Sequence, residues 1–474
     1  MQSETNQRSI IQIKRLIWLY FFLLIFEGTF RKWILPQYSD VLLVVRDPVV
    51  LAIYFVALKA RVFPWKGYVM WLTVIAILSF LVSLIVLEPY LPLKPLFLVT
   101  AFGFRSNFLH LPLIFVIGKV LDQDDVKTLG RWVLIGSIPM CLLLVLQFNA
   151  APDAFINRTA GIGEAQQITA GGGKIRPPGT FSFVSGVIFC AALSAAYLLY
   201  GALKRGLYRD WLLYGGGLAL VVTIGVSGSR SVFLAVLLVL SSLLAIIVFR
   251  PSAVNNFGRN LLIVVLVLLV ASRLPVFKEG AQLLSDRFTT VAEAEEGTIA
   301  GGLVTRIFSG FTEGLLLLSR APIGGYGLGI GTNGGAKFLT GRALFLLSEG
   351  EWGRIILESG PILGLAFLAW RTMLTLKLGL FSIRRLRRGE ILPIMFYCAA
   401  FLSLLSGQFG QPTNSGFAVF VCGLCLAAAN TKTPAESPVA DGPVLRRVAR
   451  RSRYAERIHT LPAARRHPDD FVDR

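Results

Sequence analysis

Arg230 lies in the stretch GVSGSRSVFL, between two apolar runs that each approach membrane-spanning length. An ionisable residue at membrane depth indicates a functional role. The small hydroxyl residues beside it leave room for an anionic group and add hydrogen-bond donors. The alternative is a cation that only sets topology or extends to the membrane surface. We favour the first interpretation, in which Arg230 faces an anionic ligand.

Further arginines follow in the long segment 276–345, which precedes the third-last apolar run. Arg306 opens the stretch VTRIFSGFTEGLLLLS, where apolar residues recur with the period of an amphipathic helix. The planar guanidinium binds phosphate with two parallel donors, so Arg306 is a second candidate anion ligand. Arg176, in RPPGTFSF, and Arg320 are candidate substrate contacts. A solvated, mutually paired surface explains most other charges of this segment.

The stretch SEGEWGRIILESGPILG carries three glutamates and an arginine where an apolar run begins. Glu351, Arg354 and Glu358 are three and four positions apart, so they share one face of a helix. One interpretation is an internal Glu–Arg–Glu ion pair. The other is a buried carboxylate that acts as a general base. Glu351 and Glu349 are the candidate bases, and Arg354 is a candidate substrate contact.

The stretch GGYGLGIG at positions 324–331 is rich in glycine, which permits positive φ and close backbone approach to a ligand. No strand precedes it and no Walker lysine follows, so it does not fit a nucleotide-binding signature. It is either a tight turn that brings the loop back to the membrane or a ligand-contacting loop. In the second case Tyr326 is a candidate substrate contact.

Histidine and cysteine offer no cofactor chemistry. His459 and His467 lie in the C-terminal tail, and His110 stands alone at the start of an apolar run. No His, Cys and Asp residues have metal-ligand spacing, and neither a G-x-S-x-G nor an ATP-binding motif occurs in the sequence. We therefore predict no metal and no cofactor, and a reaction driven by the substrate itself.

These residues must be positioned by membrane helices. Of the 474 residues 54% are hydrophobic and 16% are charged, against roughly a quarter charged in soluble proteins. Several runs reach the ~20 apolar residues that cross a bilayer, which predicts an all-α polytopic membrane protein. About twelve spans are expected, near 12–27, 40–58, 68–87, 107–121, 132–149, 181–203, 211–227, 231–249, 260–275, 346–370, 391–409 and 414–429. Apolar Leu96–Phe104 indicates that the fourth is broken or preceded by a re-entrant piece.

Lysine and arginine in the short loops predict the orientation. The even number of spans and the basic loops, including a cluster at 371–388, place both termini in the cytoplasm. Ala150–Thr180 and the loop 276–345 then lie outside. Residues 1–430 form the membrane domain, and the basic tail 431–474 is predicted to be disordered. The net charge of +20 is concentrated beside the membrane, which favours anionic lipid over nucleic acid as its partner.

Over roughly 10–430 the sequence resembles the O-antigen ligase and O-antigen polymerase family. The resemblance rests on SGSRS ahead of a span, TRIFSGFTEGLLLLSRAPIGGYGLGIG in the long loop, and LESGPILGL entering the next span. The stretches FEGTFRKWILP, VVRDPVVLAIYFVAL and FRSNFLHLPLIFVIGKV are similar to a subgroup of that family. The order of these motifs fits the predicted topology.

The resemblance implies a donor glycan linked to undecaprenyl diphosphate and an acceptor that is another glycan or a lipid A core. It implies that Arg230 and Arg306 hold the diphosphate. Family members typically carry a histidine nine residues before the glutamate that corresponds to Glu358, and this chain has Glu349 there. Glu349 or Glu351 is then the substitute base, or this acceptor needs none.

We therefore expect a metal-independent glycosyltransferase of the bacterial inner membrane that acts on its periplasmic face. Polymerase and ligase differ only in the acceptor, and the missing histidine weakly favours polymerase. The alternatives are a flippase for the lipid-linked glycan and a non-catalytic assembly partner. The gathering of charged residues on one face, without an internal repeat, favours the enzyme. The sugar, the linkage and the oligomeric state stay open.

Overall fold

The structure is a computed structural model that describes residues 2–161, 167–254, 273, 275, 277–282, 310–341 and 345–430. The named helices are α1 (Gln2–Thr29), α2 (Ser39–Leu42), α3 (Asp47–Lys59), α4 (Gly67–Leu87), α5 (Leu93–Phe104), α6 (Leu113–Val120), α7 (Gln123–Asn149), α8 (Ser185–Leu203), α9 (Asp210–Val226), α10 (Arg230–Phe249), α14 (Asn333–Thr340), α15 (Glu351–Arg387), α16 (Leu392–Ser406) and α17 (Pro412–Ala427). Shorter π or 3₁₀ turns are η1 (Phe30–Ile34), η2 (Pro36–Tyr38), η3 (Arg105–Leu109), η4 (Phe155–Asn157), η5 (Pro251–Val254) and η6 (Leu317–Ser319). A two-residue strand β2 (Lys174–Ile175) pairs antiparallel with β1 (Thr169–Gly171).

Among the described residues, eight helical stretches are long and apolar enough to cross a membrane. They are Asn6–Ile34, Pro36–Lys59, Gly67–Leu87, Leu93–Val120, Gln123–Asn149, Ser185–Leu203, Arg230–Phe249 and Glu351–Arg387. Asp210–Val226, Gly310–Ser319, Leu392–Ser406 and Pro412–Ala427 are shorter apolar helices. The chain is an all-α polytopic membrane protein, as predicted. Most of the predicted span 260–275 and the whole predicted tail 431–474 lie outside the described residues.

The fourth predicted span, 107–121, is wrong at its start. The membrane-spanning stretch begins at Leu93 and consists of α5, the π-helical turn η3, a turn at 110–112 and α6, so the span is broken, which was one of the two alternatives predicted. The turn η3 places Arg105 and Asn107 inside the protein, 6% and 1% exposed. A π-helical turn inside a helix shifts its side chains relative to the regular period, and such turns are frequent at functional sites.

The structure also differs from the predicted span 346–370. Helix α15 runs from Glu351 to Arg387, but Gly360 interrupts it with φ 75° and ψ 170°. The two arms fold back on each other, since a Cβ at Gly364 would lie 3.0 Å from Ile356 Cα. Arg371, which the sequence places in the cytoplasmic cluster, is instead fully buried beside Glu351. The predicted end of this span at residue 370 is wrong because the helix continues through Arg371 to Arg387.

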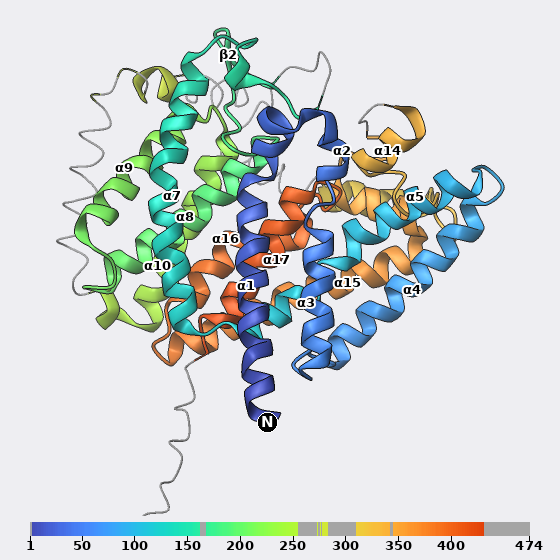
Figure 1. Ribbon diagram of the computed structural model, residues 1–474, viewed down its shortest axis with the longest axis horizontal. Coiled ribbons are helices and arrows are strands. Elements are labelled where there is room, and N and C mark those ends of the chain that lie inside the picture. Colours follow the sequence, from blue (N-terminus) through green and yellow to red (C-terminus); the bar gives the residue numbers. More distant parts are fainter. Residues whose placement is uncertain are drawn as a thin grey trace, which may run out of the picture. The chain divides into compact units, whose positions relative to one another are not determined.

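The segments predicted to lie outside meet at one end of the described part, which we call the hairpin end because it carries β1 and β2 (Figure 1). Lys32 of η1 donates to Gly179 O, and a side chain at Gly228 would contact Ala170 of β1. At the opposite, N-terminal end, Lys14 pairs with Asp122 at 3.1 Å. These contacts are consistent with the predicted outer loops lying at the hairpin end and the predicted cytoplasmic loops at the N-terminal end.

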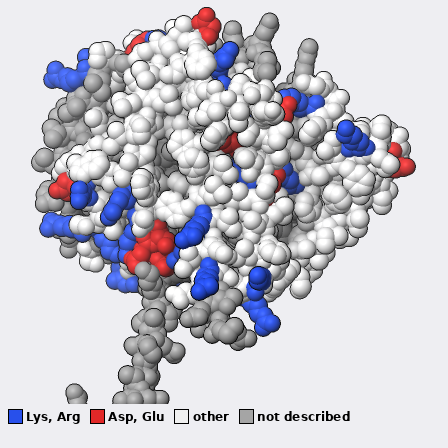
Figure 2. Space-filling view, viewed as in Figure 1, with Lys and Arg blue, Asp and Glu red and all other residues white. Residues whose placement is uncertain are grey.

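The charge pattern of the face in Figure 2 fits a membrane protein. Lysine and arginine concentrate toward its lower, N-terminal end, and a broad middle zone is largely uncharged. Exposed side chains of the membrane helices include Leu51, Phe55, Ile85 and Leu244, which are 55–73% exposed. Apolar side chains exposed in number on helices of this length are expected where lipid is the solvent.

Candidate functional site

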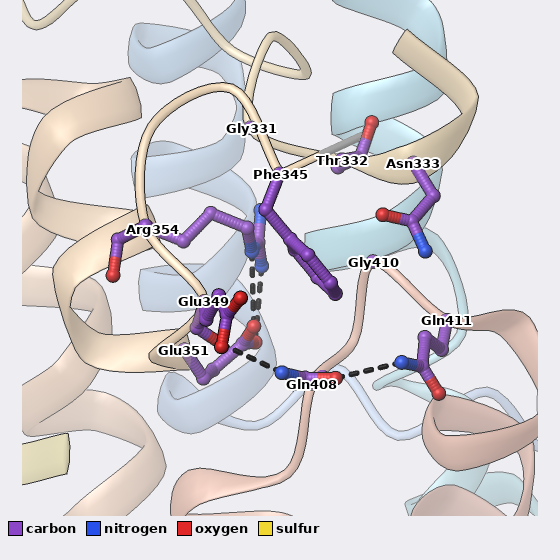
Figure 3. A pocket seen from close by; sticks show the side chains of 11 residues that line it. Gly331, Thr332, Asn333, Phe345, Glu349, Glu351, Arg354, Gln408, Gly410 and Gln411 are labelled. Carbon is purple, nitrogen blue, oxygen red and sulfur yellow. Dashed lines mark hydrogen bonds and ion pairs between the residues drawn. The ribbon is translucent and has the colours of Figure 1, made fainter. Parts of the chain in front are cut away.

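A pocket at the hairpin end brings three predicted site residues together (Figure 3). Its wall and floor come from the glycine turn with the start of α14, the start of α15, and the loop between α16 and α17. The lining residues are Gly331, Thr332, Asn333, Phe345, Ser348, Glu349, Glu351, Arg354, Gln408, Gly410 and Gln411. Glu349, Glu351 and Arg354 are therefore neighbours of one opening.

The floor of the pocket is an ion cluster on the first arm of α15. Arg354 Nε lies 2.9 Å from Glu351 Oε2, and its Nη1 lies 2.6 Å from Glu358 Oε2. The predicted shared helix face is confirmed by these two pairs. The third nitrogen, Nη2, donates to Asn107 Oδ1 of η3 at 2.7 Å. All four residues are at most 4% exposed.

A second buried arginine completes the cluster from the other arm of α15. Arg371 Nη1 lies 2.8 Å from Glu351 Oε1, which also accepts from Phe409 N at 3.1 Å. Arg371 further donates to Leu404 O and Gly407 O, at 2.9 and 3.1 Å. Two guanidinium groups match the two glutamates, so the floor is balanced in charge and both oxygens of Glu351 are committed to the fold.

Glu349 differs from Glu351 because it stands on the rim. Its side chain is exposed, and only its backbone carbonyl is tied down, by Gln408 Nε2 at 2.6 Å. Figure 3 shows Glu349 close above Glu351 and Gln408. An accessible carboxylate over a charge-balanced floor has the geometry to accept a proton from a bound hydroxyl group.

The glycine turn supports the same floor. Gly325, Gly327 and Gly329 have φ of 72°, 107° and 96°, which L side chains rarely adopt. Gly331 N donates to Glu358 Oε1 at 2.9 Å, so the turn fixes the carboxylate that holds Arg354. The stretch forms a tight turn, and its last glycine, Gly331, also lines the pocket. Tyr326 is exposed, its backbone N donates to Leu357 O, and it does not line the pocket.

A second ionic network joins residues of the stretches FEGTFRKWILP, VVRDPVVLAIYFVAL and FRSNFLHLPLIFVIGKV. Arg46 Nε lies 3.1 Å from Glu27 Oε2, and Asp47 pairs with both Arg105 and His110, the latter at 3.0 Å. His110 is thus not isolated at the start of a span, because the membrane-spanning stretch begins 17 residues earlier, at Leu93. Arg46 Nη2 also donates to Pro412 O at 2.6 Å, which links this network to the pocket loop.

The remaining predicted cations lie elsewhere. Arg230 is the first residue of α10, half-buried, directly after the turn at Gly228 with φ 55°. Arg176 lies beside that turn, its Cγ 3.8 Å from the position of a Cβ at Gly228. Arg320 is exposed after η6. None of the three lines the pocket, and Arg306 lies outside the described residues.

The pocket and cluster residues that the sequence analysis missed include Asn107, Asn333, Phe345, Arg371, Gln408 and Gln411. A polar residue inside an apolar run is a functional signal, and that signal was available for Asn107. Arg371 gave no such signal because basic neighbours at 384–388 made it look cytoplasmic. The two glutamines lie in a short loop whose approach to α15 only the fold reveals.

Comparison with known protein families and with curated proteins gives no match to this chain.

Proposed function

We propose that this protein is a glycosyltransferase of the bacterial inner membrane that transfers a glycan from an undecaprenyl-diphosphate carrier to a sugar hydroxyl. The hairpin end would face the periplasm and both termini the cytoplasm. The observation that carries the proposal is the pocket at this end, with exposed Glu349 above the buried Glu351–Arg354–Glu358–Arg371 cluster.

The proposed reaction needs only an acceptor hydroxyl, a diphosphate leaving group and side chains that this sequence contains. The acceptor oxygen attacks the anomeric carbon and the bond from that carbon to the diphosphate oxygen breaks, with inversion. The departing diphosphate takes the electron pair, and Glu349 takes the proton of the acceptor hydroxyl. Diphosphate is a good leaving group, and a fixed cation lowers the energy of the charge that develops on it.

Arg230 and Arg306 are the proposed diphosphate ligands. The position of Arg230 supports its role, because it begins a membrane helix at the hairpin end, where the N-terminal amide groups also favour an anion. Arg176 beside the same turn adds a second cation nearby. Arg354 is reassigned from substrate contact to support of the floor, because its three nitrogens bond Glu351, Glu358 and Asn107.

A genetic experiment separates the proposed function from its alternatives. The gene is deleted and the cell-surface polysaccharide is resolved on gels. Single-repeat products indicate a polymerase, full-length unattached lipid-linked chains indicate a ligase, and precursor held on the cytoplasmic side indicates a flippase.

Complementation then tests the cations. We expect Arg230→Ala and Arg306→Ala each to lower polymer formation at least tenfold at equal protein level, because each removes a charge-assisted contact to the diphosphate. Arg205→Ala, an exposed arginine at the N-terminal end, is the matched control and should complement fully. Full complementation by both test variants contradicts the diphosphate assignment.

A further inference from the structure

The rim of the pocket carries carboxamides where the floor carries charge. Asn333 comes from the start of α14, and Gln408 and Gln411 from the loop between α16 and α17. Gln411 Nε2 donates to Gln408 Oε1 at 2.7 Å, and Gln408 Nε2 donates to Glu349 O at 2.6 Å. The glutamines therefore form one chain that ends at the backbone carbonyl of Glu349.

These carboxamides keep hydrogen-bonding capacity for a ligand. Asn333 Oδ1 is buried and has no hydrogen-bond partner among the described residues. Figure 3 shows that oxygen on the side facing Phe345. A carboxamide offers two donor hydrogens and an acceptor oxygen, and a sugar hydroxyl is likewise donor and acceptor, so the two groups are complementary.

Phe345 supplies an apolar surface at the same opening. Its side chain is 44% exposed, and Figure 3 shows the ring between Arg354 and Gln411, across the opening. An exposed aromatic ring beside convergent polar groups is typical of small-molecule sites. A sugar ring presents the matching pair of surfaces, an apolar face of C–H groups and an edge of hydroxyl groups.

The charge of the pocket selects among sugars. The charged lining residues are Glu349, Glu351 and Arg354, so the lining has an excess of one negative charge, and Glu313, which accepts from Ser348 at 3.1 Å, adds a second acid beside the rim. A carboxylate of an acidic sugar would then lie close to a like charge, which is strongly unfavourable in a partly enclosed site. An uncharged sugar meets no such repulsion.

We propose that Asn333, Gln408, Gln411 and Phe345 form the subsite for the acceptor sugar, and that Glu349 restricts it to uncharged sugars. This inference rests on the proposed glycosyl transfer and adds the class of acceptor to it. The diphosphate of the donor lies outside this subsite, at the cations near the start of α10. The loop of Gln408 is held at both ends, by Arg371 on Gly407 O and by Arg46 on Pro412 O, so the carboxamides are preorganised.

Binding of simple sugars to the purified full-length protein tests the subsite without any transfer. Saturation-transfer NMR is run with methyl glycosides of neutral hexoses and N-acetylhexosamines, and with glucuronic and galacturonic acid. We expect at least one neutral glycoside to bind, and the uronic acids to bind at least tenfold more weakly. The double variant Gln408→Leu with Gln411→Leu should weaken binding of the neutral glycoside about tenfold or more, because two hydrogen bonds to the sugar are lost.

Two further variants sharpen the result. Glu349→Gln should bring the uronic acids to within about threefold of the neutral glycoside, because the like charge is removed. Gln37→Leu, an exposed glutamine at the same end of the protein, should change nothing. Absence of sugar binding by the wild type, or unchanged binding in the double variant, overturns the subsite.

The subsite and the transfer fail separately. If the double variant abolishes sugar binding but deletion of the gene leaves the cell polysaccharide unaltered, the subsite is supported and the transferase function is rejected. Confirmed transfer with an unchanged KM for the acceptor in the double variant rejects the subsite and keeps the transferase.

Discussion

Glu349 and Glu351 stand two positions apart in the sequence and meet opposite surroundings. Glu351 is 3% exposed and accepts from Arg354, Arg371 and the backbone of Phe409. Glu349 is exposed on the rim and keeps its carboxylate accessible. The fold therefore gives Glu351 a structural role in the ion cluster and leaves Glu349 available as a base. The sequence alone did not distinguish the two roles.

Replacing each glutamate by glutamine separates the two roles. Glu351→Gln leaves Arg371 without its carboxylate partner and the buried cluster with one unmatched positive charge, because Arg354 still pairs with Glu358, so we expect a loss of about 3–5 kcal/mol in unfolding free energy. Glu349→Gln should change stability by less than about 0.5 kcal/mol but lower the transfer rate about 10²–10⁴-fold. Thermal unfolding in detergent and a transfer assay measure the two effects. Equal loss of stability in both variants contradicts the assignment.

At this scale the sequence predicted the Glu351–Arg354–Glu358 face, because helical spacing is local information. It did not predict Arg371 or Asn107, since their approach to Arg354 depends on a fold-back at Gly360 and on a π-helical turn. The Gly360–Pro361 pair is a local signal for a helix break, but the contact between the two arms is tertiary, and the π-helical turn has no distinct local pattern.

Among the elements, the break in α15 positions the site. Gly360 has φ 75° and ψ 170°, and its Cα region packs against the backbone of Ile323 and Gly325. The break lets the arm that bears Glu351 return alongside the arm that bears Arg371. Without it, a straight helix would carry the two residues about 30 Å apart, at 1.5 Å per residue over twenty positions.

Gly360→Ala tests this element. Alanine disfavours that backbone region and its Cβ would collide with Ile323 O, so we expect a loss of about 1–3 kcal/mol or more and a lower unfolding temperature. Gly136→Ala in α7 is the control, because that glycine is exposed and no atom lies within 4 Å of the added Cβ. The control should be neutral or slightly stabilising. A stable Gly360→Ala protein with full activity contradicts the role of the break.

Helix locations were largely predictable, because a membrane span needs a long apolar run and the chain contains many. Two boundaries were not. The start at Leu93 depends on continuing a helix through polar residues of η3, and the end at Arg387 on carrying a helix through Arg371 into a basic cluster. The polar residues of η3 and Arg371 are stabilised by buried partners from other elements, and the periodicity of the sequence does not reveal these partners.

For the whole molecule, the contacts divide the loops into a hairpin end and an N-terminal end. The positive-inside rule then predicts that the hairpin end is periplasmic. Gln37→Cys, exposed near η1, should react with a membrane-impermeant maleimide in cells with a permeabilised outer membrane. Arg205→Cys, exposed between α8 and α9, should react only after lysis. The reverse pattern contradicts the orientation.

Glycosyl transfer by the purified protein in liposomes is the decisive measurement for the proposed activity. The assay contains undecaprenyl-diphosphate oligosaccharide labelled in the glycan, an acceptor glycan, EDTA and no nucleotide. We expect a labelled product with inverted anomeric configuration, which Arg230→Ala and Glu349→Gln reduce at least tenfold. A folded wild-type protein that leaves the donor unreacted, or only moves it to the other leaflet, would contradict the proposed transfer.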